Sequence, residues 1–141
     1  MKNSYGVYRE IILEHWRHPH NFVQIEKAGK KTFVHNGPKA RYIASRYNPS
    51  CGDEIRLEIL FKEDQVKEVK FPGVGCAISQ ASASLLTDYL KGKKIKDLEK
   101  IDKDTILKLL GVEIGPTRLK CALLSLEALK KLIQLQDAQK D

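Results

Sequence analysis

The spacing of apolar residues changes once along this chain, and that change constrains the fold more than any other feature. In residues 54–62 the odd-numbered positions from 55 to 61 are apolar and their neighbours are mostly polar, which is typical of a strand with one buried face. Glu63 and Asp64 then form a tight turn into a second strand over residues 66–71, and strands joined so closely pair antiparallel. After Pro72 the apolar residues recur at helical spacing to the end of the chain.

The remaining segments complete this pattern. We expect helices over residues 4–17, 76–90 and 117–136, and a short one that begins after the cap Asp102 and ends at Gly111. A further strand is expected over residues 41–47. Residues 19–40 are rich in Pro, Gly and Asn with little periodicity, and we interpret them as an irregular, mobile connection. The sequence therefore predicts an α+β fold: a small antiparallel sheet of about three strands, helices packed on one face, and a long C-terminal helix.

The length of 141 residues predicts one domain over residues 1–141, of which 1–40 form the N-terminal helix and the mobile segment. The formal net charge is +7, but the lysine clusters at 27–31 and 91–96 are not interleaved with aromatic residues. We interpret them as solvated surface that can dock an acidic protein, and expect no nucleic-acid partner. No signal peptide precedes the first helix and no run approaches the ~18 apolar residues of a membrane helix, so we expect a cytoplasmic protein without a membrane partner.

The three cysteines, at positions 51, 76 and 121, need a separate explanation. Their odd number and their separations of 25 and 45 residues do not form a disulfide framework. Each lies at the edge of an expected element, and Cys76 and Cys121 lie near helix N-termini, which favour the reactive thiolate. Asp53 follows Cys51 across a glycine, so three thiolates and one carboxylate could complete a tetrahedral metal site. A carboxylate exchanges more readily than a fourth thiolate, which suits a site that releases what it binds. Without a C-x-x-C pair, the alternative that each cysteine is simply a small buried apolar residue stays open.

Four segments resemble the IscU/SufU/NifU N-terminal family of iron–sulfur cluster assembly scaffold proteins. They are YREIILEHWRHPHNF at residues 8–22, NPSCGD at 48–53, GVGCAISQASASLLTDYLKGK at 73–93 and RLKCALLSLEAL at 118–129. The order of the motifs matches that family across nearly the whole chain. The third-cysteine motif is most similar to the SufU branch, which also tends to have a lysine at the position of Lys120. The short separation between the second and third cysteines is similar to IscU.

The resemblance implies that Cys51, Asp53, Cys76 and Cys121 bind the metal or cluster, with Asp53 permitting cluster release. It implies a scaffold, not an enzyme, that accepts persulfide sulfur at Cys121 or Cys76 from a cysteine desulfurase and binds iron. A transient [2Fe–2S] cluster would then pass to recipient apo iron–sulfur proteins. The alternative is a zinc-bound sulfur acceptor of the SufU type that activates the desulfurase and relays persulfide. We expect a monomer or weak dimer whose N-terminal helix and ligand loops meet the desulfurase.

The other polar residues of these motifs have simpler interpretations. We expect the histidines to be packing or surface residues, Trp16 to be a core or interface residue, and the serines of the second motif to pack between helices. The residues concerned are His15, His18, His20, His35, Trp16, Ser79, Ser82 and Ser84.

Overall fold

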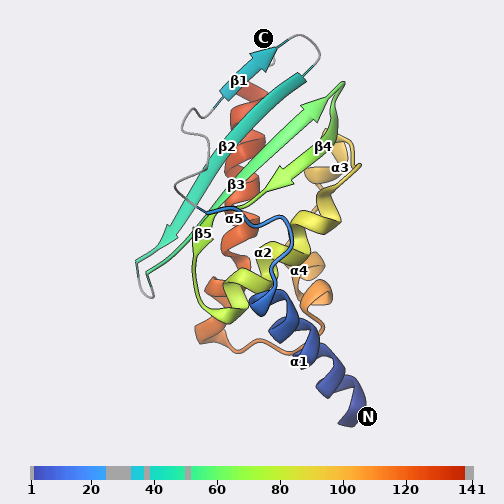
Figure 1. The fold of residues 1–141 in the computed structure, drawn as a ribbon, viewed down its shortest axis with the longest axis vertical. Coiled ribbons are helices and arrows are strands. Elements are labelled where there is room, and N and C mark those ends of the chain that lie inside the picture. Colours follow the sequence, from blue (N-terminus) through green and yellow to red (C-terminus); the bar gives the residue numbers. More distant parts are fainter. Residues whose placement is uncertain (1, 25–32, 37–38, 50–51, 139–141) are drawn as a thin grey trace.

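A computed structural model describes residues 2–24, 33–36, 39–49 and 52–138 of the chain. It is an α+β fold in which helices lie behind and below one sheet (Figure 1). The elements are α1 (Lys2–Arg17), β1 (Phe33–Asn36), β2 (Lys39–Asn48), β3 (Asp53–Lys62), β4 (Gln65–Lys70), β5 (Gly73–Val74), α2 (Ala77–Leu90), α3 (Ile95–Leu98), α4 (Lys103–Leu110) and α5 (Pro116–Ala138).

The sheet confirms the expected antiparallel pairing. Its order is β1-β2-β3-β4, and the two-residue strand β5 pairs with the beginning of β3. β2 and β3 pair along their whole lengths, from Lys39 opposite Lys62 to Asn48 opposite Asp53. The odd-numbered residues of β3 from 53 to 61 are all buried, as the alternation of the sequence requires. The sheet therefore presents one continuous apolar face to the helices.

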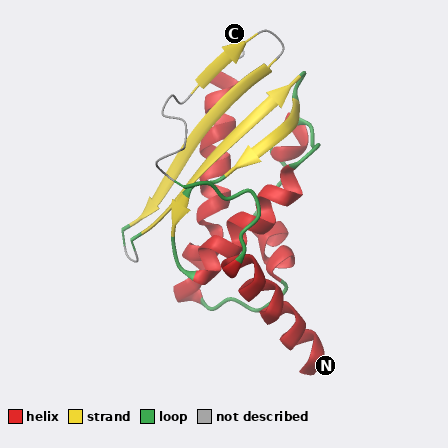
Figure 2. Cartoon of the chain, viewed as in Figure 1, coloured by secondary structure: helices red, strands yellow, loops and turns green. Residues whose placement is uncertain are grey.

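The long helix α5 lies along that face, against β2 and β3 (Figure 2). α2 packs on α5 and supports α1 on its other side. α4 begins with a capping box between Asp102 and Thr105 and ends at Gly111, which has a left-handed φ of 72°. The largest fully buried side chains come from β3, from the link between β4 and β5, and from α2, α3, α4 and α5: Phe71, Ile55, Leu57, Ile59, Leu86, Leu90, Leu98, Ile106, Leu110, Leu124, Leu129 and Leu132.

The structure corrects the interpretation of residues 19–40 as an irregular connection. Phe33–Asn36 is a strand that pairs antiparallel with β2, in the register Asn36 opposite Lys39. Backbone hydrogen bonds also tie Asn21 and Val23 to Phe71, at the end of β4. Residues 25–32 and 37–38 of the predicted mobile segment lie outside the described residues. A strand as short as β1 has too few alternating positions to show in the sequence, and its hydrogen bonds come from β2.

One short helix and one side chain, α3 and Trp16, also need comment against the sequence prediction. α3 was not expected, because four residues are too few to show helical periodicity. Trp16, expected in the core or at an interface, is not in the core, since 44% of its surface is exposed on α1; its place at an interface stays a prediction. Within the described ranges, no helix combines the length and apolar character needed to cross a membrane.

Candidate metal centre

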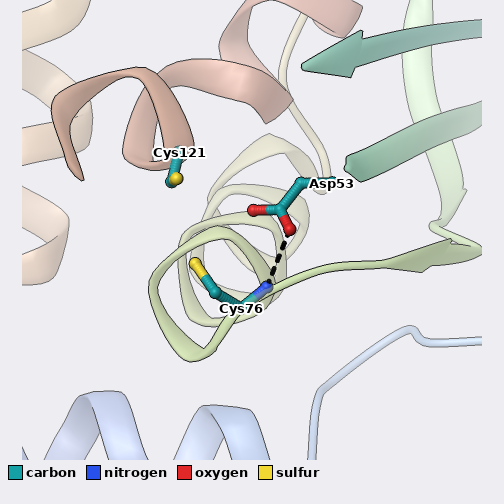
Figure 3. Close-up of side chains that lie close together, drawn as sticks. All are labelled: Asp53, Cys76 and Cys121. Carbon is teal, nitrogen blue, oxygen red and sulfur yellow. Dashed lines mark hydrogen bonds between the residues drawn. The ribbon is translucent and has the colours of Figure 1, made fainter. Parts of the chain in front are cut away.

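Three of the four expected ligands converge on one point. Asp53 is the first residue of β3, Cys76 is the N-cap of α2, and Cys121 lies in the second turn of α5. One ligand atom from each, a carboxylate oxygen or a sulfur, lies within 4.8 Å of the others (Figure 3). The fourth expected ligand, Cys51, lies outside the described residues, two positions before Asp53.

Strand β5 explains why Asp53 and Cys76 meet. It pairs antiparallel with the beginning of β3, with Val74 opposite Glu54 and Gly73 opposite Ile55. The chain therefore leaves β5 beside the first residue of β3 and enters α2 there. The backbone N–H of Cys76 donates to Asp53 Oδ1 at 3.2 Å. This bond satisfies one of the free donors at the start of a helix and fixes the carboxylate against α2.

Gly75 makes this close approach possible. A Cβ atom at Gly75 would lie 2.1 Å from Ser79 Oγ and 3.3 Å from the carboxyl carbon of Asp53. Ser79 is fully buried, and its hydroxyl donates to the carbonyl of Cys76 at 3.1 Å. The first turn of α2 is thus packed without a gap against Asp53, so that the backbone itself positions the ligands.

The burial of Asp53 is the main indication that the site binds a cation. Its side chain is only 5% exposed, and within the described part of the chain Oδ2 has no hydrogen-bond partner. Figure 3 shows this oxygen pointing toward the two cysteine side chains, while the other oxygen faces the N–H of Cys76. An ionised carboxylate buried without a partner is costly. A metal ion held between Oδ2 and the two sulfurs would remove that cost.

The donor set fits a soft or borderline metal. Thiolates with one carboxylate bind zinc or iron at metal–ligand distances of about 2.0–2.3 Å, which place tetrahedral donors roughly 3.3–3.8 Å apart. The three donors of this site lie within 4.8 Å of one another, so a modest approach would bring them to that spacing. Cys121 is buried and Cys76 is exposed, so the site is closed toward α5 and open on the side of Cys76.

A second polar cluster joins α1 to α2 and does not contribute to this site. His15 Nδ1 lies 2.6 Å from Ser84 Oγ, and His20 Nδ1 lies 2.5 Å from Asp88 Oδ2. Burial, and then the neighbouring His20, lower the pKa of His15 below its usual 6.5. Burial would raise the pKa of Asp88, but hydrogen bonds from His20 and Asn21 outweigh it and hold that pKa below 3.8. His15, expected to be a packing or surface residue, is half-buried and packs against α2 through Ser84.

The remaining serines, histidines and Lys120 differ in how deeply they are buried. Ser79, Ser82 and Ser84 are buried in helix packing, as expected. His18, His20 and Lys120 are exposed, although His20 is paired with Asp88. The side chain of His35 lies outside the described residues. Sequence reasoning missed the role of strand β5, because a two-residue strand leaves no periodic signal.

Comparison with known proteins shows the family of the chain. The family model of the NifU-like N terminal domain matches residues 7–140. The chain belongs to this family. The resemblance drawn from the four sequence motifs is therefore confirmed.

Two curated relatives show the breadth of the family around this NifU-like domain. The chain is 34% identical to the zinc-dependent sulfurtransferase SufU of Bacillus subtilis (strain 168), over 89% of this chain and 88% of that protein. It is 32% identical to the iron-sulfur cluster assembly scaffold protein IscU of Rickettsia prowazekii (strain Madrid E), with the same coverage. A solved structure of a nitrogen-fixing NifU-like protein (N-terminal) from Brucella abortus matches with a TM-score of 0.68 at 17% identity, covering 94% of this chain and 95% of that one. This last likeness shows a shared fold.

Proposed function

We propose that this NifU-like domain is an iron–sulfur cluster assembly scaffold. The observation that supports it most strongly is the convergence of Asp53, Cys76 and Cys121, with one buried carboxylate oxygen that lacks a partner. Cys51, two residues before Asp53, would supply the fourth donor. Three thiolates and one exchangeable carboxylate suit a site that holds iron and sulfide for a limited time. The similarity to the Rickettsia scaffold protein gives independent support.

Sulfur would arrive as the outer atom of a persulfide on a cysteine desulfurase. A thiolate of this chain attacks that outer sulfur; the S–S bond to the desulfurase breaks, its cysteine leaves as a thiolate, and a new S–S bond forms here. No net oxidation occurs in this exchange. Cys76 and Cys121 are the candidate acceptors, and of these two the exposed Cys76 is the one that a partner reaches more readily. Reduction of each transferred sulfur to sulfide then takes two electrons from an external reductant.

The domain would act together with two classes of protein partner. A cysteine desulfurase would supply sulfur, and apo iron–sulfur proteins would receive the [2Fe–2S] cluster as cargo. The protein is then an assembly scaffold and not a catalyst of its own reaction. We propose that it works as a monomer or weak dimer in the reducing cytoplasm, where free thiols persist.

A second candidate function is a zinc-bound sulfur acceptor that activates a desulfurase and relays persulfide. The similarity to the zinc-dependent sulfurtransferase of Bacillus subtilis favours it. Cys51, Asp53, Cys76 and Cys121 would hold zinc, which in such a site keeps thiolates deprotonated and stabilises the fold. The alignment with the Bacillus protein is longer, 142 residues against 127 for the Rickettsia protein, although both cover the same share of this chain. The extra length consists of positions that only the Bacillus protein fills. This chain therefore lacks residues that the Bacillus protein has.

Reconstitution under anaerobic conditions tests the scaffold proposal. We expect the metal-free protein, given ferrous iron, cysteine, a desulfurase and a thiol reductant, to develop the visible absorption of a [2Fe–2S] cluster. Asp53→Ala should form a longer-lived cluster, because the exchangeable carboxylate is lost, and a less stable cluster in that variant would contradict the exchangeable-ligand argument. Cys121→Ser, which removes a thiolate donor, should lower the yield. A folded protein that forms no cluster would contradict the proposal.

Metal analysis of the purified protein separates the two functions. Zinc at one equivalent that resists replacement by iron, with desulfurase activation but no cluster, would favour the sulfur acceptor. Iron with acid-labile sulfide in equal amounts would favour the scaffold.

A further inference from the structure

The two helices that bear Cys76 and Cys121 are joined by a buried side-chain hydrogen bond. Ser82 on α2 donates from its hydroxyl to the backbone carbonyl of Ala122 on α5 at 2.6 Å. Its oxygen also lies 3.3 Å from the hydroxyl of Ser125. Ser82 is 1% exposed and both partners on α5 are fully buried, so water does not compete for this contact.

The position of this contact connects it to the metal centre. The accepting carbonyl belongs to the residue that follows Cys121, and Ser82 lies six residues after Cys76 on the same helix. Six residues of α-helix span about 9 Å. The bond therefore fixes α2 against α5 less than two turns from the thiols. A serine and an alanine at the contact keep the two backbones close, because neither side chain is bulky.

The backbone carbonyl that accepts this bond already has a hydrogen-bond partner within its own helix. The carbonyl of Ala122 lies inside α5, where it accepts an N–H from the next turn. The hydroxyl of Ser82 is thus an additional donor, and an alanine there would have the better helix propensity. A buried hydroxyl at such a place is costly unless its bond is made, so it defines one relative position of the two helices.

We propose that Ser82 is a positioning residue for the metal centre: its bond to Ala122 sets the separation of the Cys76 and Cys121 sulfurs. This inference rests on the proposed function, in that these thiols bind zinc or iron. Ser125 contributes as a weaker partner of the same hydroxyl. Groups that hydrogen-bond directly to metal ligands change metal affinity by about 10–100-fold when they are lost, and Ser82, which acts through the residue after Cys121, should fall at the lower end of that range.

The test measures zinc affinity with a competing chromophoric chelator in the full chain. We expect Ser82→Ala to bind zinc about tenfold more weakly than the unaltered protein. We expect Ser125→Ala to lose affinity in the same direction by a smaller factor. Cobalt(II) substitution gives a second readout: the visible bands of tetrahedral cobalt should weaken or shift in Ser82→Ala.

Ser84→Ala is the matched control. Ser84 is as deeply buried on the same helix, but its hydroxyl bonds to His15 and to the backbone N–H of His20 instead of α5. Its loss should lower the stability of the metal-free protein and leave zinc affinity unchanged. Unfolding of each metal-free variant in urea measures how much each hydroxyl contributes to folding alone.

The outcomes separate the inference from the function on which it rests. Unchanged zinc affinity and cobalt bands in Ser82→Ala would overturn the positioning role, as would equal losses of affinity in Ser82→Ala and Ser84→Ala. Absence of zinc and iron binding by the unaltered protein would instead overturn the proposed function, and the inference with it.

Discussion

At the scale of single residues, Asp53 shows a conflict between folding and binding. Its carboxylate is buried, and one oxygen accepts the N–H of Cys76 while the other has no partner among the described residues. Folding alone would favour a neutral group at this position, because a buried unpaired charge destabilises the native state. A residue that is unfavourable for folding and correctly placed for a ligand indicates a binding role.

Asp53→Asn separates these two effects. The amide oxygen can still accept the Cys76 N–H, but the negative charge and the anionic donor are lost. We expect the metal-free variant to be more stable than the unaltered protein by about 1 kcal/mol or more. It should bind zinc at least about 10–100-fold more weakly, since the loss of an outer partner of a ligand already costs that much. Urea unfolding and chelator competition measure the two quantities.

Glu54→Gln is the control for that comparison, since Glu54 is the next carboxylate on β3 and faces the opposite side of the sheet. It should change neither quantity appreciably. A metal-free Asp53→Asn protein that is less stable than the unaltered chain would show that the carboxylate serves folding after all.

Gly75→Ala should disturb the same ligands through the backbone. The added Cβ would overlap Ser79 Oγ at 2.1 Å inside a buried turn, and overpacking of this kind costs about 1–3 kcal/mol. We expect lower stability together with weaker zinc binding, because Asp53 is also in contact. Urea unfolding and zinc titration measure both.

The double variant Gly75→Ala with Ser79→Ala removes the overlapping hydroxyl. Partial recovery of both stability and zinc affinity is expected, since the remaining Ser79 Cβ would be 3.3 Å away. If the double variant were as impaired as Gly75→Ala alone, the cause would be the backbone conformation and not the overlap.

At the scale of elements, the attachment of α1 to α2 depends on polar contacts. His15 and the backbone of His20 bond to Ser84, and Asn21 bonds to Thr87 and Asp88. The rings of His15 and His20 lie 4.5 Å apart, so a charge on both would be unfavourable. These contacts should make the position of α1 sensitive to pH.

The lowered pKa of His15 determines how the folding stability changes with pH. The unfolded chain takes up a proton at His15 near pH 6.5, while the folded protein resists this until a lower pH. Stability is therefore lost as the pH falls from about 6.5 through the folded pKa of His15. The lowered pKa of Asp88 acts only in more acidic solution, where stability is lost as the pH falls from about 3.8.

The fluorescence of Trp16 can follow this loss of stability at low pH, because Trp16 is the sole tryptophan of the chain and lies on α1 next to His15. We expect the urea midpoint, followed by Trp16 fluorescence, to decrease between pH 7.5 and 5.5. In His15→Gln this decrease should be smaller, since the group that titrates is absent. An equal decrease in both proteins would assign the pH dependence to other groups.

At the scale of the whole molecule, the sequence predicted the elements that have many residues and a clear period. α2, α5 and the β3–β4 hairpin agree with their predicted ranges to within a few residues because their apolar faces are long. β1, β5 and α3 have two to four residues each and were missed, since their stability comes from the strands and helices beside them.

The site was predictable to a similar degree. The motifs indicated Cys76, Cys121 and Asp53 as ligands, and the structure brings these three together. The sequence could not show that β5 places Asp53 beside α2, nor that Ser82 bonds across to α5 instead of simply filling space. Both depend on contacts between segments that lie far apart along the chain.

Binding of a metal at the junction of β3, α2 and α5 should stabilise the whole domain, because the unfolded chain does not bring these donors together. At a free zinc concentration of about 100 times the dissociation constant, linkage contributes about 2.7 kcal/mol. For a chain of this size that raises the thermal midpoint by about 10 °C. Differential scanning calorimetry of the protein with zinc, and then with a chelator in excess, measures the shift and its reversal.

The identity of the metal gives the control. Magnesium prefers an all-oxygen, octahedral shell, and should leave the midpoint unchanged at the same free concentration. Asp53→Asn should show a smaller shift with zinc than the unaltered protein, from a higher starting midpoint. A shift of equal size with magnesium would mean that stabilisation comes from general charge screening of a chain with a formal charge of +7, and would remove the support that thermal stabilisation gives to a thiolate site.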